Sequence, residues 1–301
     1  MTAGIERARA KARPASRKRG NREIARIPSG LEGISETMLW TLYDRACESS
    51  RADAILVDPD SVRICNAIDY DFAGHFGHPV GAFSARAAEI DRLLKDWLDR
   101  HPKGLVISLG EGLETQAHRV DNGHMTWLTV DLPPAIELRE RFLPSSRRFR
   151  CIASSVFEPD WANGIKASAD VFVVAQGLFM YLQPDAVRRL FIRIAERFPG
   201  AEIAFDAIPR WFSGLTQWGV MTTPRYRLPS MPWGINGDEI EAHLHGWSSD
   251  IAALRTFEYC APRGWPKLAA DLCRLHPLVK SHLPFLVHVK LQDRRLAGRA
   301  G

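Results

Sequence analysis

Two glycines at the end of an apolar run are the first residues in the sequence that could do chemistry. Gly110 and Gly112 follow residues 105–109, a run typical of a buried strand. Small residues at a strand-to-helix turn let backbone N–H groups contact a ligand. The next such run, 126–131, ends in Asp131, 21 positions after Gly110 and close to the offset of about 20 residues at which an acid binds a ribose. Together these residues predict a site for a nucleotide-type cofactor.

The residues around the two glycines discriminate between two kinds of cofactor. Thr115 stands where a dinucleotide-binding motif has a third small residue, and Glu111 would add like charge beside a pyrophosphate. S-adenosylmethionine (SAM) carries an amino acid and an adenosine but no phosphate, so it suits this turn better. We therefore predict SAM as the cofactor, with a NAD-dependent oxidoreductase as the alternative.

Three motifs in this order resemble those of the leucine carboxyl methyltransferase family. They are Ser-Leu-Gly-Glu-Gly-Leu-Glu-Thr at 108–115 with Arg119 downstream, Val-Asp-Leu-Pro at 130–133, and Ala-Gln-Gly-Leu-Phe-Met-Tyr-Leu at 175–182. The similarity covers roughly residues 35–206 and is closer still to the bacterial O-methyltransferases of the family that are associated with polyketide tailoring. It implies a class I methyltransferase fold and SAM-dependent methyl transfer to a carboxyl or hydroxyl oxygen of a small-molecule acceptor.

The resemblance also implies which residues hold the cofactor. Arg86 corresponds to the family arginine that pairs with the methionine carboxylate, as a guanidinium can do bidentately; the alternative is a solvent-facing helix arginine. The family's Asp-Leu pair that holds the adenine falls on Ser155 and Val156, so that carboxylate is missing. The full predicted set of cofactor-binding residues is Arg86, Gly110, Glu111, Gly112, Asp131, Leu132, Ser155, Val156, Gln176 and Gly177.

One member of that set departs from the family in a way that bears on activity. The family's usual Glu before Gly is Gln176 here. An amide can hydrogen-bond a cofactor or substrate, but it cannot act as a base and adds no negative charge beside the sulfonium. A catalytically weakened SAM-binding protein is therefore a further alternative.

The sequence contains no paired acid and base that demands a catalytic role. A carboxylate acceptor is already ionised at pH 7, whereas a phenol would gain from a general base. The acceptor-side candidates are Tyr181 and Asp206, expected near strand ends where such sheets bind ligands, together with His75 and Trp211. Tyr181 and Asp206 are explained equally well as structural hydrogen-bond partners. Neither the histidines nor the five cysteines have the spacing of metal ligands, so no metal is predicted.

Alternating strands and helices must position these residues. Apolar strands that alternate with helices predict an α/β fold, a doubly wound, mainly parallel sheet of seven strands. The expected strands are 105–109, 126–131, 149–153, 171–175, 202–205, 255–259 and 285–291. A first helix is expected to begin at Ser35, and further helices are expected over 83–98, 113–120, 135–142, 184–197, 237–244 and 266–275.

Positive charge is concentrated at the N-terminus. Residues 1–30 contain nine Lys and Arg against two acids, whereas the remaining 271 residues have 31 against 33, a net charge of −2. Because the body of the chain is nearly neutral, a nucleic-acid partner is not expected. The longest apolar run, 171–182, is too short to span a membrane, and no secretory signal is present, which favours the cytoplasm.

The composition also suggests how the chain is divided. We expect a disordered basic tail over 1–28 and one methyltransferase domain over 29–301. Within that domain, 29–103 would form an N-terminal helical cap. The tryptophan-rich stretch 207–250 would form a substrate-covering insertion, or alternatively a satellite hydrophobic cluster under a long loop.

Overall fold

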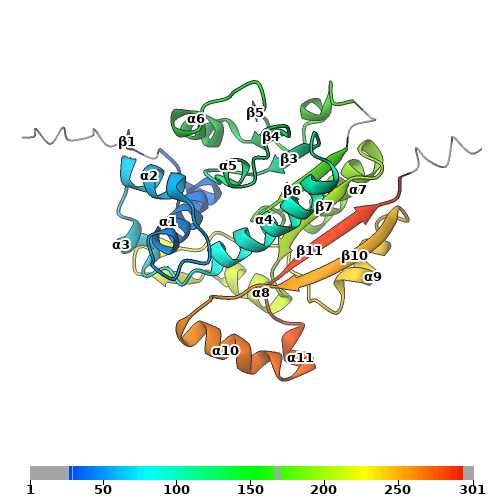
Figure 1. Ribbon diagram of the computed structural model, residues 1–301. Coiled ribbons are helices and arrows are strands. Elements are labelled where there is room, and N and C mark those ends of the chain that lie inside the picture. The colour runs from blue at the N-terminus through cyan, green and yellow to red at the C-terminus, as the bar shows by residue number, and fades with distance from the viewer. Residues whose placement is uncertain (1–26, 29, 167–169, 294–301) are drawn as a thin grey trace, which may run out of the picture.

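A seven-stranded sheet forms the centre of the computed structural model, which describes residues 27–28, 30–166 and 170–293 (Figure 1). The strand order is β10-β11-β7-β6-β3-β4-β5. All pairs are parallel except those of β11, which is antiparallel to both neighbours. The strands are β3 (Leu105–Leu109), β4 (Thr126–Asp131), β5 (Phe149–Ala153), β6 (Val171–Ala175), β7 (Glu202–Ala207), β10 (Ile251–Glu258) and β11 (Phe285–Leu291). The predicted α/β sheet is confirmed, with β10 beginning four residues earlier than expected.

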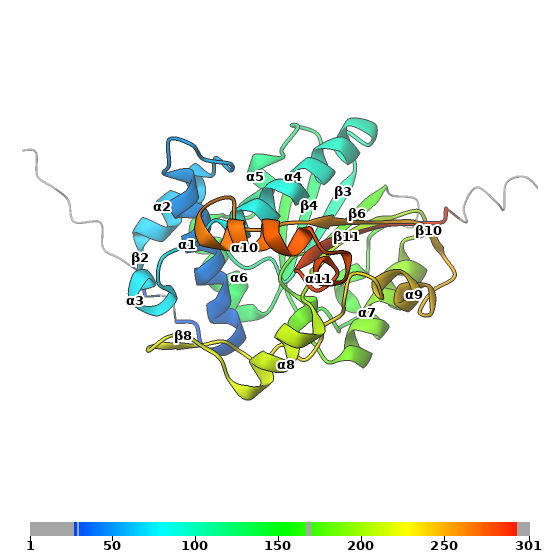
Figure 2. The same ribbon diagram turned by 90° about the horizontal axis from the view of Figure 1, so that it is seen from below.

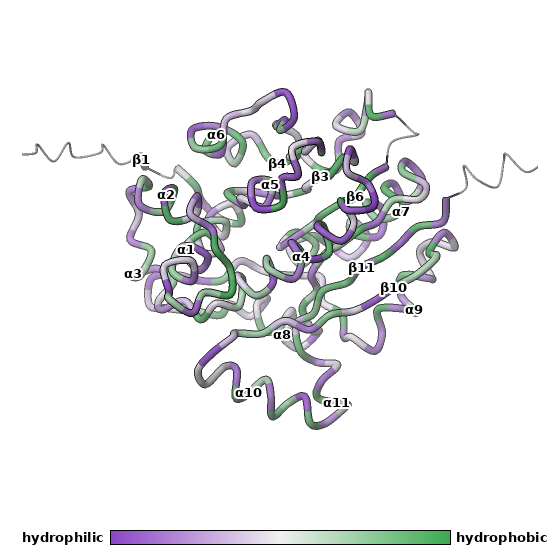
Figure 3. The backbone as a smooth tube through the Cα atoms, viewed as in Figure 1, coloured by the Kyte–Doolittle hydropathy of each residue, from purple (hydrophilic) through white to green (hydrophobic). Residues whose placement is uncertain are grey.

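Helices cover both faces of this sheet. Ile90 and Trp97 of α4 pack with Phe172 on one face, whereas Leu190 of α7 packs with Val173 on the other. Figure 3 shows hydrophobic and hydrophilic residues alternating along these covering helices. The helices are α1 (Thr37–Ser49), α2 (Pro59–Ala67), α3 (Phe72–Phe76), α4 (Ala82–Arg100), α5 (Gln116–Arg119), α6 (Pro133–Phe142), α7 (Pro184–Arg197), α8 (Arg210–Trp218), α9 (Ile240–His245), α10 (Gly264–Arg274) and α11 (Pro277–Lys280).

The helix expected over 113–120 is shorter than predicted. It covers only Gln116–Arg119, because the residues before it form the turn after β3. Carbonyl oxygens of that turn, at Gly112 and Glu114, accept hydrogen bonds from Arg139 on α6 instead of from a helix. A side chain distant in sequence therefore sets where this helix begins.

The N-terminal helices and the stretch after β7 meet over the carboxyl ends of the parallel strands. Leu39 and Ile64 share a buried cluster with Met180, Leu228 and Met231. Figure 2 shows α1 and α8 at this end of the sheet. Two short strand pairs that were not predicted lie outside the main sheet: β1 (Ile27–Pro28) with β2 (Ile68–Asp69), and β8 (Met221–Thr223) with β9 (Tyr226–Arg227).

The predicted basic tail over 1–28 lies outside the described residues, except for Ile27 and Pro28, which form β1. Among the described helices, none is both long enough and apolar enough to cross a membrane.

Candidate functional site

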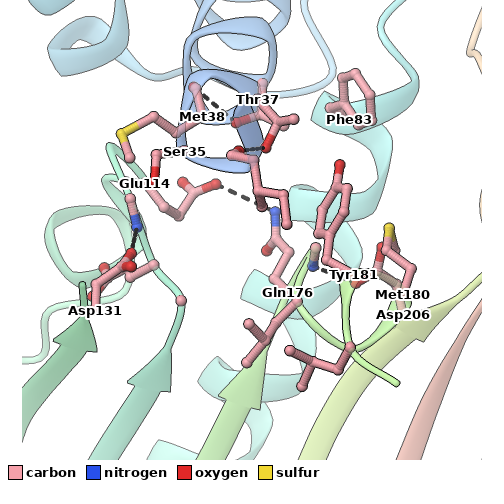
Figure 4. A pocket seen from close by; sticks show the side chains of 18 of the residues that line it. Ser35, Thr37, Met38, Phe83, Glu114, Asp131, Gln176, Met180, Tyr181 and Asp206 are labelled. Carbon is pink, nitrogen blue, oxygen red and sulfur yellow. Dashed lines mark hydrogen bonds between the residues drawn. The ribbon is translucent and has the colours of Figure 1, made fainter. Parts of the chain in front are cut away.

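A cavity of about 390 Å³ lies at the carboxyl ends of β3, β4 and β6 (Figure 4). Its wall is contributed by the N-terminal helices, by the turns that follow these strands and by the stretch after β7. All ten predicted cofactor-binding residues line it: Arg86, Gly110, Glu111, Gly112, Asp131, Leu132, Ser155, Val156, Gln176 and Gly177. Strand ends and turns far apart in the sequence are thus brought to one place, as the doubly wound topology requires.

The turn after β3 needs both of its glycines. Gly110 and Gly112 have φ angles of +64° and +54°, which residues other than glycine rarely adopt. A Cβ at Gly112 would lie 2.8 Å from the Cβ of Met38, and one at Gly110 would lie 2.9 Å from a methyl carbon of Leu178. The backbone can therefore approach the cavity only because these two side chains are absent.

Asp131 is held at the edge of the cavity by backbone donors. The Gly112 N–H donates to its Oδ2 and the Leu132 N–H to its Oδ1, both at 2.7 Å. Burial raises the pKa of Asp131, and these two hydrogen bonds counter that effect by stabilising the charged form. The carboxylate is therefore fixed in place while it borders the cavity.

Glu111 is buried in an ion pair of its own. Its Oε1 lies 2.9 Å from Arg139 Nη2, and its Oε2 accepts hydrogen bonds from Trp127 Nε1 at 3.0 Å and from the Thr129 hydroxyl. Although burial raises the pKa of Glu111, Arg139 opposes the rise. Both carboxylate oxygens of Glu111 are engaged within the protein. The negative charge of Glu111, which argued against a pyrophosphate in the sequence analysis, is therefore balanced by Arg139.

A buried cluster of charged side chains lies beneath the turn. Arg119, named in the sequence motif, lies 2.7 Å from Asp91 and 2.7 Å from Glu114. Arg45 contacts Glu114 at 2.9 Å and Asp58 at 3.2 Å. Burial alone would raise the pKa of Glu114, but the two guanidinium groups outweigh it and lower the pKa to about 2. Glu114, which also lines the cavity, is therefore ionised at any physiological pH.

Arg86 and Gln176, which line the cavity, each have a buried polar atom without a partner among the described residues, as does Gln116. Gln176 donates its Nε2 to Glu114 Oε2 at 3.3 Å, which leaves its Oε1 buried and unpaired (Figure 4). Arg86 Nη1 lies 2.6 Å from Asp206, while its Nε is buried and unpaired. Buried polar groups are nearly always satisfied, so the unpaired atoms of Gln176 and Arg86 are compatible with a ligand in this cavity. One donor on a cation and one acceptor beside Glu114 fit a carboxylate and an ammonium, the two charged groups of an amino acid.

Arg86 is only 3% exposed, which excludes the alternative of a solvent-facing helix arginine.

Much of the cavity lining is apolar and aromatic. This part consists mainly of Trp40, Phe83, Leu178, Met180, Tyr181, Phe212, Leu228 and Met231. Burial raises the pKa of Tyr181 to about 12, so its hydroxyl stays protonated at neutral pH. Phe212, Leu228 and Met231 come from the stretch expected to cover a substrate, whereas Trp233 packs in the core against Phe179 and Phe205.

Two of the four acceptor-side candidates, Tyr181 and Asp206, line the cavity, and the other two do not. His75 lies on α3, where its ring is 4.6 Å from that of Tyr70. Trp211 is 55% exposed, and its Nε1 donates to the carbonyl of His282 at 2.9 Å. Neither side chain borders the cavity, because α3 packs against the outer side of the N-terminal helices and Trp211 points outward from α8.

Sequence reasoning missed Arg45, Arg139 and Tyr259. Arg139 lies on the buried side of α6 among Ile136 and Leu138, which is an unusual position for an arginine and the one signal that could have indicated it. Among the described residues, no cluster of three or more His, Cys, Asp or Glu could hold a metal ion.

Similarity to known proteins agrees with this site. The profile of the leucine carboxyl methyltransferase family matches residues 39–195, just over half of the chain. The tetracenomycin polyketide synthesis O-methyltransferase TcmP of Streptomyces glaucescens is 30% identical over 220 residues, which is 72% of this chain and 81% of that protein. The S-adenosyl-L-methionine-dependent methyltransferase dpfgK of Gibberella zeae is 26% identical over 200 residues, covering 59% of this chain and 67% of its own length.

A solved structure supports the fold in turn. The DszA carbon methyltransferase superimposes with a TM-score of 0.51 at 12% identity, covering 86% of this chain and 66% of that one. These similarities favour a methyltransferase over the NAD-dependent alternative. The chain therefore belongs to the leucine carboxyl methyltransferase family, and it is an S-adenosylmethionine-dependent O-methyltransferase with a class I fold.

Proposed function

We propose that this protein methylates the carboxylate of an apolar, aromatic small molecule of polyketide type, in the cavity described above. The observation that carries the proposal is that Arg86 and Gln176, each with an unpartnered polar atom, line the same cavity as Asp131. They suit the carboxylate and ammonium of SAM at one end, while Asp131 suits its ribose at the other. Ser155 and Val156 would then border the adenine.

The remaining space suits the acceptor. When bound, SAM supplies a methyl group attached to a positively charged sulfur. The chain's contribution is alignment of the acceptor and exclusion of water, both of which the aromatic wall provides. Phe83 and Phe212 are large and apolar and lie on that wall, so we infer an acceptor with a flat hydrophobic body. The polyketide-related name of the relative TcmP agrees with such a body.

The acid–base groups of the cavity favour a carboxylate acceptor over a hydroxyl. Among its described lining residues there is no histidine, lysine or cysteine. Each lining carboxylate is engaged: Glu111 and Glu114 by arginines, Asp206 by Arg86, and Asp131 by backbone N–H groups. None is free to take a proton at neutral pH. A carboxylate acceptor arrives ionised and needs no base.

Gln176 is consistent with a carboxylate acceptor. An amide at this position removes a possible base, but methyl transfer to a carboxylate uses none, so Gln176 is compatible with full activity. This distinguishes the proposal from that of a catalytically weakened SAM-binding protein.

Radiolabelled SAM offers the test. The full chain is incubated with aromatic carboxylic acids and with phenols on the same ring systems, such as naphthoic acids and naphthols. We expect label in the acids, released by mild alkali because methyl esters hydrolyse and aryl ethers do not. Label confined to alkali-stable ethers would refute carboxyl methylation. Binding of S-adenosylhomocysteine (SAH) without label in any acceptor of this series would favour the weakened protein.

A further inference from the structure

Asp206 was expected on the acceptor side of the site, but its contacts lie elsewhere. We propose that Asp206 is a positioning residue, which holds Arg86 ready for the carboxylate of the cofactor, and that Tyr259 supports it. This inference depends on the proposed function, because it assumes that the cavity takes the amino-acid end of SAM beside Arg86.

Three segments far apart in the sequence converge on the Asp206 carboxylate. Its Oδ2 lies 2.6 Å from Nη1 of Arg86 on α4, and its Oδ1 accepts the N–H of Gly177, just after β6, at 2.5 Å. Asp206 itself is at the end of β7 and fully buried. One carboxylate therefore ties the arginine to the turn that carries Gln176, the residue with the unpaired acceptor.

Tyr259 adds a third contact to the Asp206 carboxylate, on the oxygen that also contacts Arg86. Its hydroxyl lies 3.5 Å from Asp206 Oδ2, and the residue directly follows β10, an edge strand of the sheet. Burial raises the pKa of Tyr259, so the hydroxyl is protonated and can donate. Asp206 thus gathers donors from two side chains and one backbone group, which leaves it little capacity to act on an acceptor.

The arginine is held close to the turn as well. The φ angle of Gly177 is +67°, and a Cβ there would lie 3.4 Å from Arg86 Nη1. With Nη1 committed to Asp206 and the side chain packed against this turn, the guanidinium of Arg86 has a defined place among the residues that line the cavity. A long flexible side chain that is ordered before its ligand arrives loses less entropy on binding.

The negative charge of Asp206 has an opposite effect on cofactor binding. Asp206 partly neutralises Arg86, which weakens the attraction of the guanidinium for a second carboxylate. Replacing Asp206 by Asn would remove that competition but would also set an amide NH₂ against either the guanidinium or the Gly177 N–H, because Asn offers one acceptor oxygen instead of two. We infer that the loss of geometry dominates, since both partners are buried and a misplaced guanidinium cannot turn to water.

Isothermal titration with two ligands tests this directly. One ligand is SAH, and the other is decarboxylated SAH, 5′-(3-aminopropylthio)-5′-deoxyadenosine, which lacks only the carboxylate. We expect Asp206→Asn to weaken SAH binding about tenfold and to change binding of the decarboxylated ligand by less than about twofold. Tyr259→Phe should give the same selective pattern with a loss of about threefold. Asp185→Asn, on the exposed first turn of α7, is the matched control and should leave both affinities unchanged.

The outcomes distinguish a failure of the proposed function from a failure of the inference about Asp206. If the unaltered chain does not bind SAH, the proposed function fails. If it binds SAH but Asp206→Asn weakens both ligands equally, Asp206 has only a structural role and the inference is overturned. Tighter binding of SAH by Asp206→Asn would overturn it too, because charge competition would then dominate. Should Asp206→Asn not fold, as judged by its thermal transition, Tyr259→Phe decides: unchanged discrimination between the two ligands refutes the inference.

Discussion

Removal of the Arg119 guanidinium would leave one buried carboxylate, that of Asp91, without its cation. Arg119 lies 2.7 Å from Asp91, 2.7 Å from Glu114 and 3.0 Å from Asp58, and its side chain is 7% exposed. In an Arg119→Met variant, Arg45 still pairs with Asp58 and Glu114. Of the contacts that stabilise the Asp91 carboxylate, only the hydrogen bond from Gln116 at 2.7 Å would remain. One buried carboxylate would thus lose its counter-ion entirely.

The expected cost follows from that unpaired charge. Breaking a buried ion pair by removing one partner typically costs about 3–5 kcal/mol. Burial already raises the pKa of Asp91 in the presence of Arg119, and without this cation the pKa must rise further. A carboxyl group whose pKa in the folded state exceeds that in the unfolded state destabilises the fold increasingly as pH rises through that range. The destabilisation by Arg119→Met should therefore be larger at pH 8 than at pH 5.

Urea unfolding of the full chain at pH 5, 6.5 and 8 measures this effect. Arg141→Met is the control, because Arg141 pairs with Glu137 at 2.7 Å on the outside of α6, where the two side chains are 46% and 71% exposed. The free energy of unfolding should change by no more than about 0.5 kcal/mol in that variant. A loss below about 1 kcal/mol for Arg119→Met, or a loss that does not grow with pH, would refute the reasoning.

Three further predictions concern the pH dependence of the rate, the acceptor and the first residue of β7, Glu202. With a carboxylic acid acceptor, the methylation rate should be flat from about pH 6 to 9, because Glu114 has a pKa of about 2 and Tyr181 one of about 12; a bell-shaped profile near neutrality would contradict this. Phe212→Ala should raise the KM for an aromatic acceptor about tenfold and leave SAH affinity unchanged; a parallel loss of SAH binding would place Phe212 on the cofactor side instead. Burial alone would raise the pKa of Glu202, but His288 and Arg100 outweigh burial and lower this pKa to about 2. The contribution of Glu202 to stability is therefore present above about pH 4.5 and lost on acidification. Thermal unfolding between pH 2 and 5 should therefore vary less in Glu202→Gln than in the unaltered chain, and equal slopes would count against this pairing.

The strands and the strand-end residues of the cofactor site could be predicted because their signals lie in short stretches of sequence. An apolar run bounded by turn residues defines β3, β4 and β6, and the residue that ends each run lies at the carboxyl edge in any parallel sheet. Gly110 and Asp131 needed only that topology to meet. Arg86, Ser155, Val156 and Gln176 were instead identified by the resemblance to the family, and they line the same cavity.

The partners of those residues could not be read in the same way. Glu111 was judged by its charge alone, and its neutralising partner Arg139 lies 28 positions later on a helix whose pattern does not distinguish a buried arginine from an exposed one. Asp206 and Arg86 are 120 positions apart, so their pairing is a consequence of the packing of α4 against the sheet. His75 and Trp211 were chosen for their chemistry, but side-chain direction on a short helix depends on what packs against it.

The central claim is that this cavity binds SAM with Asp131 at its ribose. Titration of the full chain with SAH tests it most directly, with NAD and an Asp131→Ala variant measured alongside. We predict one-to-one binding of SAH, no binding of NAD, and at least about tenfold weaker SAH binding by Asp131→Ala, since a charged hydrogen-bond acceptor is lost. Absence of SAH binding, or equal affinity in the Asp131→Ala variant, would contradict the assignment of this site.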